Sequence, residues 1–586
     1  MASGNREIAK FLKAHGIFLA ILFLAGGLRF WNLGHLHFSH DELSALIRTH
    51  FNSFQELIDQ AVRIDGHPAL VQVFLYYWAP LVDYSPFWIK LPSVLLGLGS
   101  IVLIYLSSLK LERKKAGTIT ALILSLSTFF MYYHQVARPY AYGAFFVALA
   151  GYAYVSWFFH RKENRYLLLF AIGASLAAYT HYLALLSVFL MGISALVRSW
   201  DKPKPWILTG LLVLLSFTPH LGVFWDQLQL GGVGQWLAAP DALWLWRFFS
   251  YLFNYESICV GLGLALILIG IIKKNQSLKF PETWIWFLAC FIIAFAYSTF
   301  RDPLLRYSSL LFLSPFLFLV PLEDGQGYKR WLLGFLIFMS FAIYDREYFP
   351  EAHLSPPKVA ESYLSELKNS PPVFYHWSEE KWDYYRKIDP SIPSGTFLAK
   401  DLSPCLTADE FLLLSDHASP ASWPLQLLDQ AYVLKNIDFH FGFSLYHFSK
   451  DTSQDLAYLE INGILDSSFF KTEAKQYQSL VQLETLPFFF NNAEASIVVD
   501  LQHLKGEGGH LIFQLMEGEE QKGWFAYPLK EGSNYFSRPI SDLKDEDYHW
   551  NILLDQGPEA NAHSGSIRVR WLAGNPKIYG LVKDFK

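Results

Sequence analysis

Long apolar runs separated by short polar loops fill the first three-fifths of the chain, and an ordinary mixture of polar and apolar residues follows. A helix needs about 20 apolar residues to cross a bilayer. The runs predict about eleven spanning helices, at residues 16–33, 86–109, 116–133, 139–159, 166–181, 182–198, 206–222, 257–272, 283–300, 304–320 and 330–345. Beyond about residue 350, Glu, Lys, Asp and Ser return at normal frequency, so the surroundings change there from lipid to water.

Basic residues cluster in the loops on one side of this arrangement. With the spans placed as above, the clusters at 6–13, 110–115, 161–165, 198–204, 273–279 and 329–330 all fall on the same side. Lys and Arg of short loops stay in the cytoplasm. We therefore expect a multi-pass protein of the plasma (inner) membrane, with a cytoplasmic N-terminus and a C-terminal part on the exterior or periplasmic side.

The first exterior loop, residues 34–85, contains two further helical patterns. Residues 42–62 repeat apolar side chains at helical spacing, which is typical of an amphipathic helix on a membrane face. Residues 68–80 are apolar but number only thirteen, and counting them as a crossing would put the basic cluster at 110–115 outside. They predict a helix that is re-entrant or lies at the outer surface.

The sequence predicts three regions in all. Residues 1–348 form a polytopic α-helical membrane domain. Residues 349–452 mix helical and strand patterns, which indicates a small α/β unit. Residues 453–586 carry short alternating strands bounded by Gly, Asn and Asp, which is typical of a β-sandwich.

Composition narrows the function classes. Charged residues make up only 17% of the chain, against about 25% in soluble domains. A net charge of −5 without any basic tract gives no reason to expect a nucleic-acid partner. Of the three cysteines only Cys405 lies in the soluble part, which therefore holds no internal disulfide and suits a bacterial exterior domain stabilised by its own core.

Two adjacent carboxylates, Asp41 and Glu42, follow the outer end of the first span. One interpretation is a helix N-terminus, with Ser39 or Asp41 as the cap and Glu42 favoured by the helix dipole. The functional interpretation makes Asp41 a general base at the membrane surface. Together with His37 and His40 the pair also invites a metal site, but no HExxH or CxxC spacing supports one; a divalent metal stays an unsupported alternative, and no cofactor is firmly implied.

Further polar residues lie in the same loop and at other outer turns. His67 closes the loop and is a substrate-site candidate, although a histidine at a turn is often a structural hydrogen-bonding residue. Arg138 lies between spans three and four, with Gln135 and Tyr140 beside it. An interfacial arginine commonly reaches to lipid headgroups, but this group of polar residues also fits a phosphate held by paired hydrogen bonds.

Arg306 and Tyr307 begin the tenth predicted span. An arginine inside an apolar run needs an anion, and it is a functional candidate by default. The nearby Arg301 and Asp302 have a simpler interpretation as partners of one another.

Taken in order, these motifs resemble a known family. An exterior Asp-Glu pair is followed by His-Pro, then Lys-Leu-Pro-Ser, then Gln-x-Ala-Arg-x-Tyr, then a late Arg-Tyr; they occupy residues 41–42, 67–68, 90–93, 135–140 and 306–307. This order resembles membrane glycosyltransferases of the GT-C class, in the group of protein O-mannosyltransferases and aminoarabinose transferases (glycosyltransferase family 39). Ala69, Val136 and Lys90 depart from the usual motif residues.

The resemblance implies a polyprenyl-phosphate-linked sugar as donor. Its sugar would pass, with inversion, to a hydroxyl of a protein, glycolipid or glycan on the exterior face. Asp41 would be the base with Glu42 assisting, while Arg138 and Arg306, with Lys90, hold the lipid phosphate. His40, His67, Gln135, Tyr140 and Tyr307 complete the expected substrate site.

Elementary chemistry agrees with this set of roles, because a phosphate leaves as a stabilised anion and needs cations rather than an acid. Two other function classes stay open from the residues. A transporter or flippase of lipid-linked sugars would carry charges near the bilayer midplane. A noncatalytic glycan receptor would need the spans only as an anchor.

Overall fold

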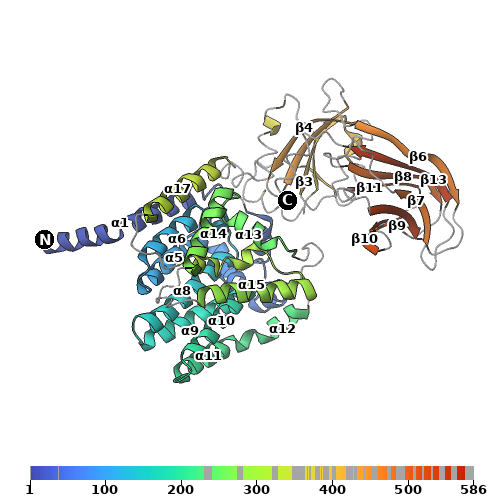
Figure 1. The fold of residues 1–586 in the computed structure, drawn as a ribbon. Helices are drawn as coiled ribbons and strands as arrows, with labels where there is room; N and C mark the ends of the chain where they lie inside the picture. Colours follow the sequence, from blue (N-terminus) through green and yellow to red (C-terminus); the bar gives the residue numbers. More distant parts are fainter. Residues whose placement is uncertain are drawn as a thin grey trace. The chain divides into compact units, whose positions relative to one another are not determined.

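The computed structural model describes residues 2–36, 38–229, 240–272, 282–319 and 327–345, and short segments and strands between residues 363 and 573. The chain divides into two compact units, Met1–Ser355 and Pro356–Lys586. The predicted boundary between 348 and 349 lies a few residues earlier. The first unit is helical and the second consists mainly of strands (Figure 1).

The helices of the first unit follow one another with short connections. They are α1 Ala2–Phe30, α2 His40–Ile47, α3 Phe54–Leu57, η1 Ile58–Val62, α4 Leu70–Leu81, α5 Pro86–Lys110, α6 Lys114–Leu126, α7 Thr128–Gln135, α8 Pro139–Phe159, α9 Asn164–Ala178, α10 Tyr182–Arg198, α11 Lys204–Phe217, η2 Thr218–His220, α12 Leu221–Gln229, α13 Trp244–Leu252, α14 Ser257–Ile272, α15 Glu282–Phe300, η3 Tyr307–Leu310, α16 Ser314–Leu317 and α17 Gly327–Asp345. Among them, η1 is a π-helix, and η2 and η3 are 3₁₀ turns.

Several of these helices are long and apolar enough to cross a bilayer. Within the described residues five helices meet this condition alone, and two bent helix pairs, α6–α7 and α13–α14, bring the number to seven if each pair is one span. Shorter apolar helices, among them α9 and α10, accompany them. The chain is therefore a multi-pass membrane protein, whereas the count of eleven spans stays a prediction.

The predicted span 304–320 is wrong as a helix. After Pro303 the backbone is irregular, with only the short turns η3 and α16, and residues 308–319 are buried. Irregular backbone at membrane depth is stable only where protein covers it. Here α8 covers it, because Gly143 and Gly151 lie against the rings of Phe312 and Phe316, where a Cβ would come within 2.6 Å and 2.3 Å of ring carbons.

The predicted helix 42–62 is also interrupted. Helix α2 ends at Ile47, and a new helix starts after Ser53, whose Oγ accepts a hydrogen bond from the Glu56 amide. The side chain of Ser53 thus favours a second N-terminus over a continuous helix. Helix α4 lies where the sequence predicted the short apolar helix 68–80.

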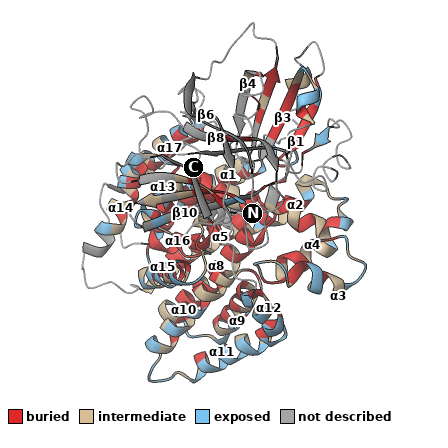
Figure 2. Ribbon diagram, turned by 90° about the vertical axis from the view of Figure 1, so that its right-hand side faces the viewer, coloured by how far each residue is buried: buried red, intermediate tan, exposed pale blue. Residues whose placement is uncertain are grey.

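Helices α5 and α8 form the centre of the helical unit and pack against each other. Figure 2 shows buried residues concentrated there and exposed residues along α11 and α12 at its periphery. In α5, Gly97 permits a close approach, since a Cβ there would lie 2.4 Å from Cγ of His134 in α7. Exposed apolar side chains such as Phe23 and Phe300 fit contact with lipid.

Two buried polar groups stabilise the bend of 67° between α6 and α7. Asn254 accepts from the amide of Thr128 at 2.7 Å and donates to the carbonyl of Leu126 at 3.0 Å. Arg29, fully buried near the end of α1, donates to the carbonyls of Leu124 at 2.7 Å and Ser125 at 3.2 Å. The backbone groups that the bend removes from the helix are thereby satisfied.

The second unit contains three sheets. The first is mixed, in the order β2-β1-β3-β5-β4, and its strands are β1 Val373–His376, β2 Thr396–Phe397, β3 Glu410–Asp416, β4 Val433–His440 and β5 Phe443–Ser449. The other two have four antiparallel strands each, in the orders β10-β9-β12-β7 and β11-β8-β13-β6. Their strands are β6 Leu459–Lys471, β7 Tyr477–Leu483, β8 Ala495–Lys505, β9 His510–Glu517, β10 Glu520–Pro528, β11 Gly532–Pro539, β12 Tyr548–Asp555 and β13 Ser564–Ala573. The β-sandwich stays a prediction.

Candidate functional site

The predicted Asp-Glu pair lies at the start of helix α2. Ser39 is the N-cap: its Oγ accepts from the Glu42 amide at 3.3 Å, and its own amide donates to Glu42 Oε2 at 2.8 Å. This reciprocal pair is a capping box, which fixes the first turn of a helix. The first turn of α2, including Asp41, is therefore held in one orientation.

Glu42 itself is buried, with an exposed fraction of 1%. Its Oε1 accepts from Lys90 Nζ at 2.5 Å and from the Ala137 amide at 2.8 Å. Both carboxylate oxygens thus have protein donors. Glu42 thereby connects the start of α2 to α5 and to the turn before α8.

Lys90 occupies the other half of this buried pair. Its side chain is 3% exposed, and its ammonium faces Glu42 and the ring of Phe38. Glu42 accepts from one of the three N–H donors of this ammonium. Lys90 is therefore the charge partner of Glu42, and its role as a phosphate ligand stays a prediction.

Asp41 differs from its neighbour because it is accessible. Its side chain is 49% exposed, and its Oδ2 lies 3.9 Å from Nη1 of Arg306, which is 33% exposed. Arg306 caps the short turn η3 at the start of the buried irregular segment, and its amide donates to Ser309 Oγ at 3.1 Å. The structure thus brings together two predicted site residues that are distant in the sequence.

Arg138 lies next to the same hydrogen bond that anchors Glu42. The amide of Ala137 donates to Glu42 at 2.8 Å. Asp41 precedes Glu42 and Arg138 follows Ala137, so this hydrogen bond joins the two segments that carry them. Burial would lower the pKa of Arg138, but the charges of Asp65 and Asp41 raise it above its ordinary value. The base candidate and this guanidinium therefore share one region of the protein.

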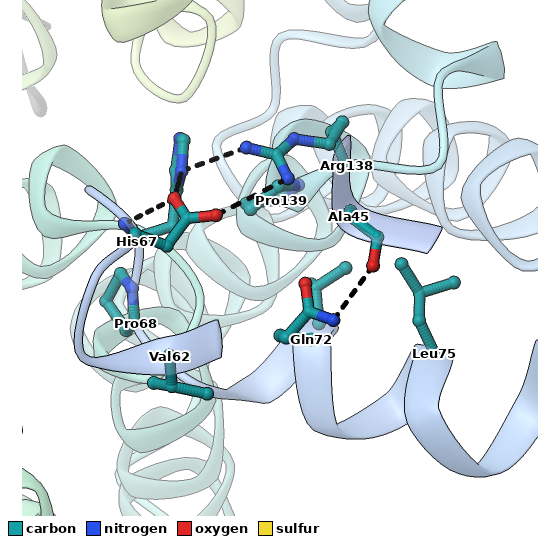
Figure 3. Close-up of a pocket in the computed structure, with 10 residues that line it drawn as sticks. Ala45, Val62, His67, Pro68, Gln72, Leu75, Arg138 and Pro139 are labelled. Atoms are coloured by element: carbon teal, nitrogen blue, oxygen red, sulfur yellow. Dashed lines mark hydrogen bonds and ion pairs between the residues drawn. The ribbon is translucent and has the colours of Figure 1, made fainter. Parts of the chain in front are cut away.

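The guanidinium of Arg138 belongs to a cluster with Asp65 and His67 (Figure 3). Nη1 lies 3.7 Å from Asp65 Oδ2, and Nη2 lies 3.2 Å from His67 Nδ1. A small cavity beside the cluster, with room for about one water molecule, is lined on its other side by Ala45, Val71, Gln72 and Leu75. Burial would raise the pKa of Asp65, but the hydrogen bond from His67 and the charges of Arg138 and Arg48 lower it well below its usual value.

The remaining predicted residues are distributed around this core. Tyr140 is buried, with its ring 4.6 Å from that of Tyr133, and Tyr307 packs against Trp244 at 5.0 Å. Gln135 uses its amide for a structural bond, donating to the carbonyl of Arg29 at 2.9 Å. His40 begins α2, but its side chain and His37 lie outside the described residues.

Two residues of this region were missed by the sequence analysis as site residues. Asp65 stands two positions before His67, and a carboxylate so close to a candidate histidine is a usable signal. The sequence analysis does not include His181, whose ring lies 5.2 Å from that of His67 and 6.2 Å from that of Tyr140. Among the described residues, no group of three His, Cys, Asp or Glu side chains is placed to hold a metal ion.

A comparison with protein families finds similarity over part of the chain. Residues 66–223, about a quarter of the chain, match the family described as dolichyl-phosphate-mannose-protein mannosyltransferase. The match includes His67, Lys90 and Arg138 and confirms the resemblance to GT-C class membrane glycosyltransferases. None of the curated proteins compared with the chain matches it.

Solved structures give weaker similarities. The structure of ArnT from Cupriavidus metallidurans bound to undecaprenyl phosphate is 10% identical, with coverage of 75% of this chain and 99% of that one and a TM-score of 0.45. The archaeal oligosaccharyltransferase AglB from Archaeoglobus fulgidus is 8% identical, with coverage of 94% and 96% and a TM-score of 0.40. These TM-scores are too low to establish a common fold.

Proposed function

We propose that this chain, whose residues 66–223 match a mannosyltransferase family, transfers a sugar from a polyprenyl-phosphate carrier to an acceptor hydroxyl. The observation that carries the proposal is an accessible carboxylate, Asp41, that lies 3.9 Å from Arg306 and whose neighbour Glu42 binds the amide just before Arg138. One base and two guanidinium groups are the set that this chemistry requires.

In this mechanism Asp41 takes the proton of the acceptor hydroxyl as its oxygen attacks the anomeric carbon. The bond between that carbon and the phosphate oxygen breaks on the opposite face, so the configuration inverts. The polyprenyl phosphate leaves with the electron pair, and Arg138 and Arg306 stabilise its negative charge. Glu42 and Lys90 act indirectly by holding α2 in place.

The spanning helices give this proposal its physical setting. A polyprenyl tail stays in the bilayer while its phosphate reaches the surface, so the donor site belongs at the end of a helical bundle. We place this site on the exterior face, together with the C-terminal unit, because of the distribution of basic loops.

The direct test is Asp41→Asn in purified full-length protein, assayed with a polyprenyl-phosphate sugar. Transfer should fall by about a hundredfold or more, since general-base contributions are typically 10²–10⁴-fold, while the unfolding profile stays that of the wild type. Asp59→Asn is the matched control, because Asp59 is exposed and pairs with Arg63 on its own helical segment. Full activity of Asp41→Asn would remove the assigned base.

The phosphate role is tested separately with Arg306→Ala. The donor KM should rise more than the acceptor KM. Arg301→Ala provides the control, because this arginine lies in the same turn, is 67% exposed and faces Asp302 at 3.7 Å. Equal effects of the two substitutions would argue that Arg306 acts only as a surface charge.

A further inference from the structure

Asp65 is a buried carboxylate that the proposed reaction does not use directly. Its side chain is 12% exposed and lies in the loop between η1 and α4. Three charged or polar side chains from different elements converge on it: Arg48 at 2.9 Å, His67 at 2.8 Å and Arg138 at 3.7 Å. Three partners around one largely buried carboxylate fix the position of its oxygens.

The two oxygens of Asp65 have different partners. Oδ1 accepts from the amide of His67 at 3.2 Å and faces its Nδ1 at 2.8 Å. Because a carboxylate only accepts, the shorter of the two contacts at Nδ1 places the proton of a neutral His67 on this nitrogen and the lone pair on Nε2, so the 3.2 Å contact of Nδ1 with Arg138 Nη2 is then not a hydrogen bond. Oδ2 faces the two arginines, Arg48 and Arg138.

The guanidinium of Arg138 has unused donor capacity. The side chain is only 9% exposed, and its Nε is buried without a hydrogen-bond partner in the described structure. A buried N–H without a partner is costly and rare, so it indicates a missing acceptor.

Charge points in the same direction. The pairs and clusters around the site contain four cations, Arg48, Lys90, Arg138 and Arg306, and three carboxylates, Asp41, Glu42 and Asp65. Asp65 is shared between two arginines, so it neutralises Arg138 only in part. An anionic ligand would supply both the missing charge and the missing acceptor.

We propose that Asp65 is a positioning residue of the donor site, which holds Arg138 so that its Nε and residual charge face the carrier phosphate and which sets the tautomer of His67. This inference rests on the proposed function, since it names the group that orients one of its phosphate ligands. Asp65 acts through Arg138 and His67 and does not itself touch the phosphate.

The test measures binding of a polyprenyl phosphate without sugar to full-length protein in lipid nanodiscs. Asp65→Asn keeps the shape of the side chain and removes its charge. Loss of a charge-assisted contact weakens affinity roughly ten- to a hundredfold, and we expect losses in this range for both Asp65→Asn and Arg138→Ala. In the double variant, affinity should match Arg138→Ala alone within about twofold, because both changes act through one contact.

Two further measurements separate positioning from a general loss of structure. In transfer assays the donor KM of Asp65→Asn should rise while the acceptor KM is unchanged, whereas a smaller folded fraction lowers kcat alone. If Asp65→Asn does not fold, Asp65→Glu keeps the charge balance and moves the carboxylate by one methylene, and it should still weaken phosphate binding severalfold. Asp59→Asn should bind as the wild type does.

The outcomes distinguish this inference from the proposed function. A wild type that binds no polyprenyl phosphate overturns both. A wild type that binds, together with Asp65→Asn and Asp65→Glu variants that bind equally well, overturns the role of Asp65 alone. Effects of Asp65→Asn and Arg138→Ala that multiply in the double variant would also overturn it.

Discussion

The buried pair of Glu42 and Lys90 offers a quantitative test of how the site is held. The two side chains are 1% and 3% exposed, and their charged atoms are 2.5 Å apart. Removing one partner of such a pair typically costs 3–5 kcal/mol, because the other charge stays buried without compensation. We therefore expect Lys90→Met to lower the free energy of unfolding by about 4 kcal/mol.

The double variant Glu42→Gln, Lys90→Met should lose less than the sum of the two single variants. It contains no buried charge, although Gln has one acceptor oxygen where Glu42 serves three donors, from Ser39, Lys90 and Ala137. One unsatisfied amide then costs about 1–3 kcal/mol. The difference from additivity should be about 2–4 kcal/mol.

The assay is reversible unfolding of full-length protein in mixed micelles, followed by circular dichroism. Lys110→Met, at the opposite end of the same helix and only partly buried, is the control and should change the unfolding free energy by less than about 1 kcal/mol. Strict additivity of Glu42→Gln and Lys90→Met, or a negligible effect of Lys90→Met, would refute the reasoning, since neither fits a desolvated ion pair.

Three other predictions concern packing and pH. Gly97→Ala should destabilise by about 1–3 kcal/mol through overlap with His134, whereas Gly192→Ala, with nothing within 4 Å, should not, as unfolding titrations will test. Asn254→Ala should cost about 2 kcal/mol or more in the same titration, because it leaves two buried backbone groups at the α6–α7 bend without partners. The folded-state pKa of Asp65 is depressed, so its stabilisation is present above its unfolded pKa of about 4 and is lost as pH falls toward the folded value. Unfolding measured between pH 5 and 3 should therefore show a weaker pH dependence in Asp65→Asn, and an unchanged slope would contradict this.

Two predicted helices agree closely with the structure. Helix α8 covers Pro139–Phe159, the predicted range, and α5 begins at Pro86 as expected. The helix predicted at 304–320 from apolar content alone is wrong, because segments buried in protein and segments buried in lipid contain the same apolar side chains. An apolar run can be irregular where another element shields its backbone from lipid. Here α8 does so, because its glycines let it approach the irregular segment closely.

Contacts between side chains far apart in the sequence could not be predicted from the sequence alone. Asp41 and Glu42 were recognised as a pair, but nothing local indicates that one is accessible and the other sealed by Lys90, 48 residues later. The contact between Asp65 and Arg138 likewise depends on how the loop before α4 folds back on the turn before α8. The sequence therefore predicted which residue types the chemistry needs, and tertiary packing decides which of them meet the substrate.

Arg29 has a consequence for how the protein is made. The helix that carries it is only 17% buried over its apolar part, and this guanidinium adds polar contacts to that limited packing. The carbonyls that accept its hydrogen bonds belong to Leu124 and Ser125, which lie 95 and 96 positions further along the chain. During synthesis the first helix thus carries a cation without its final acceptors until α6 emerges, although near a helix end an arginine costs less to insert than the roughly 2.5–3.5 kcal/mol of a central one. The N-terminal helix should therefore dock late, after the bundle that it joins has begun to form.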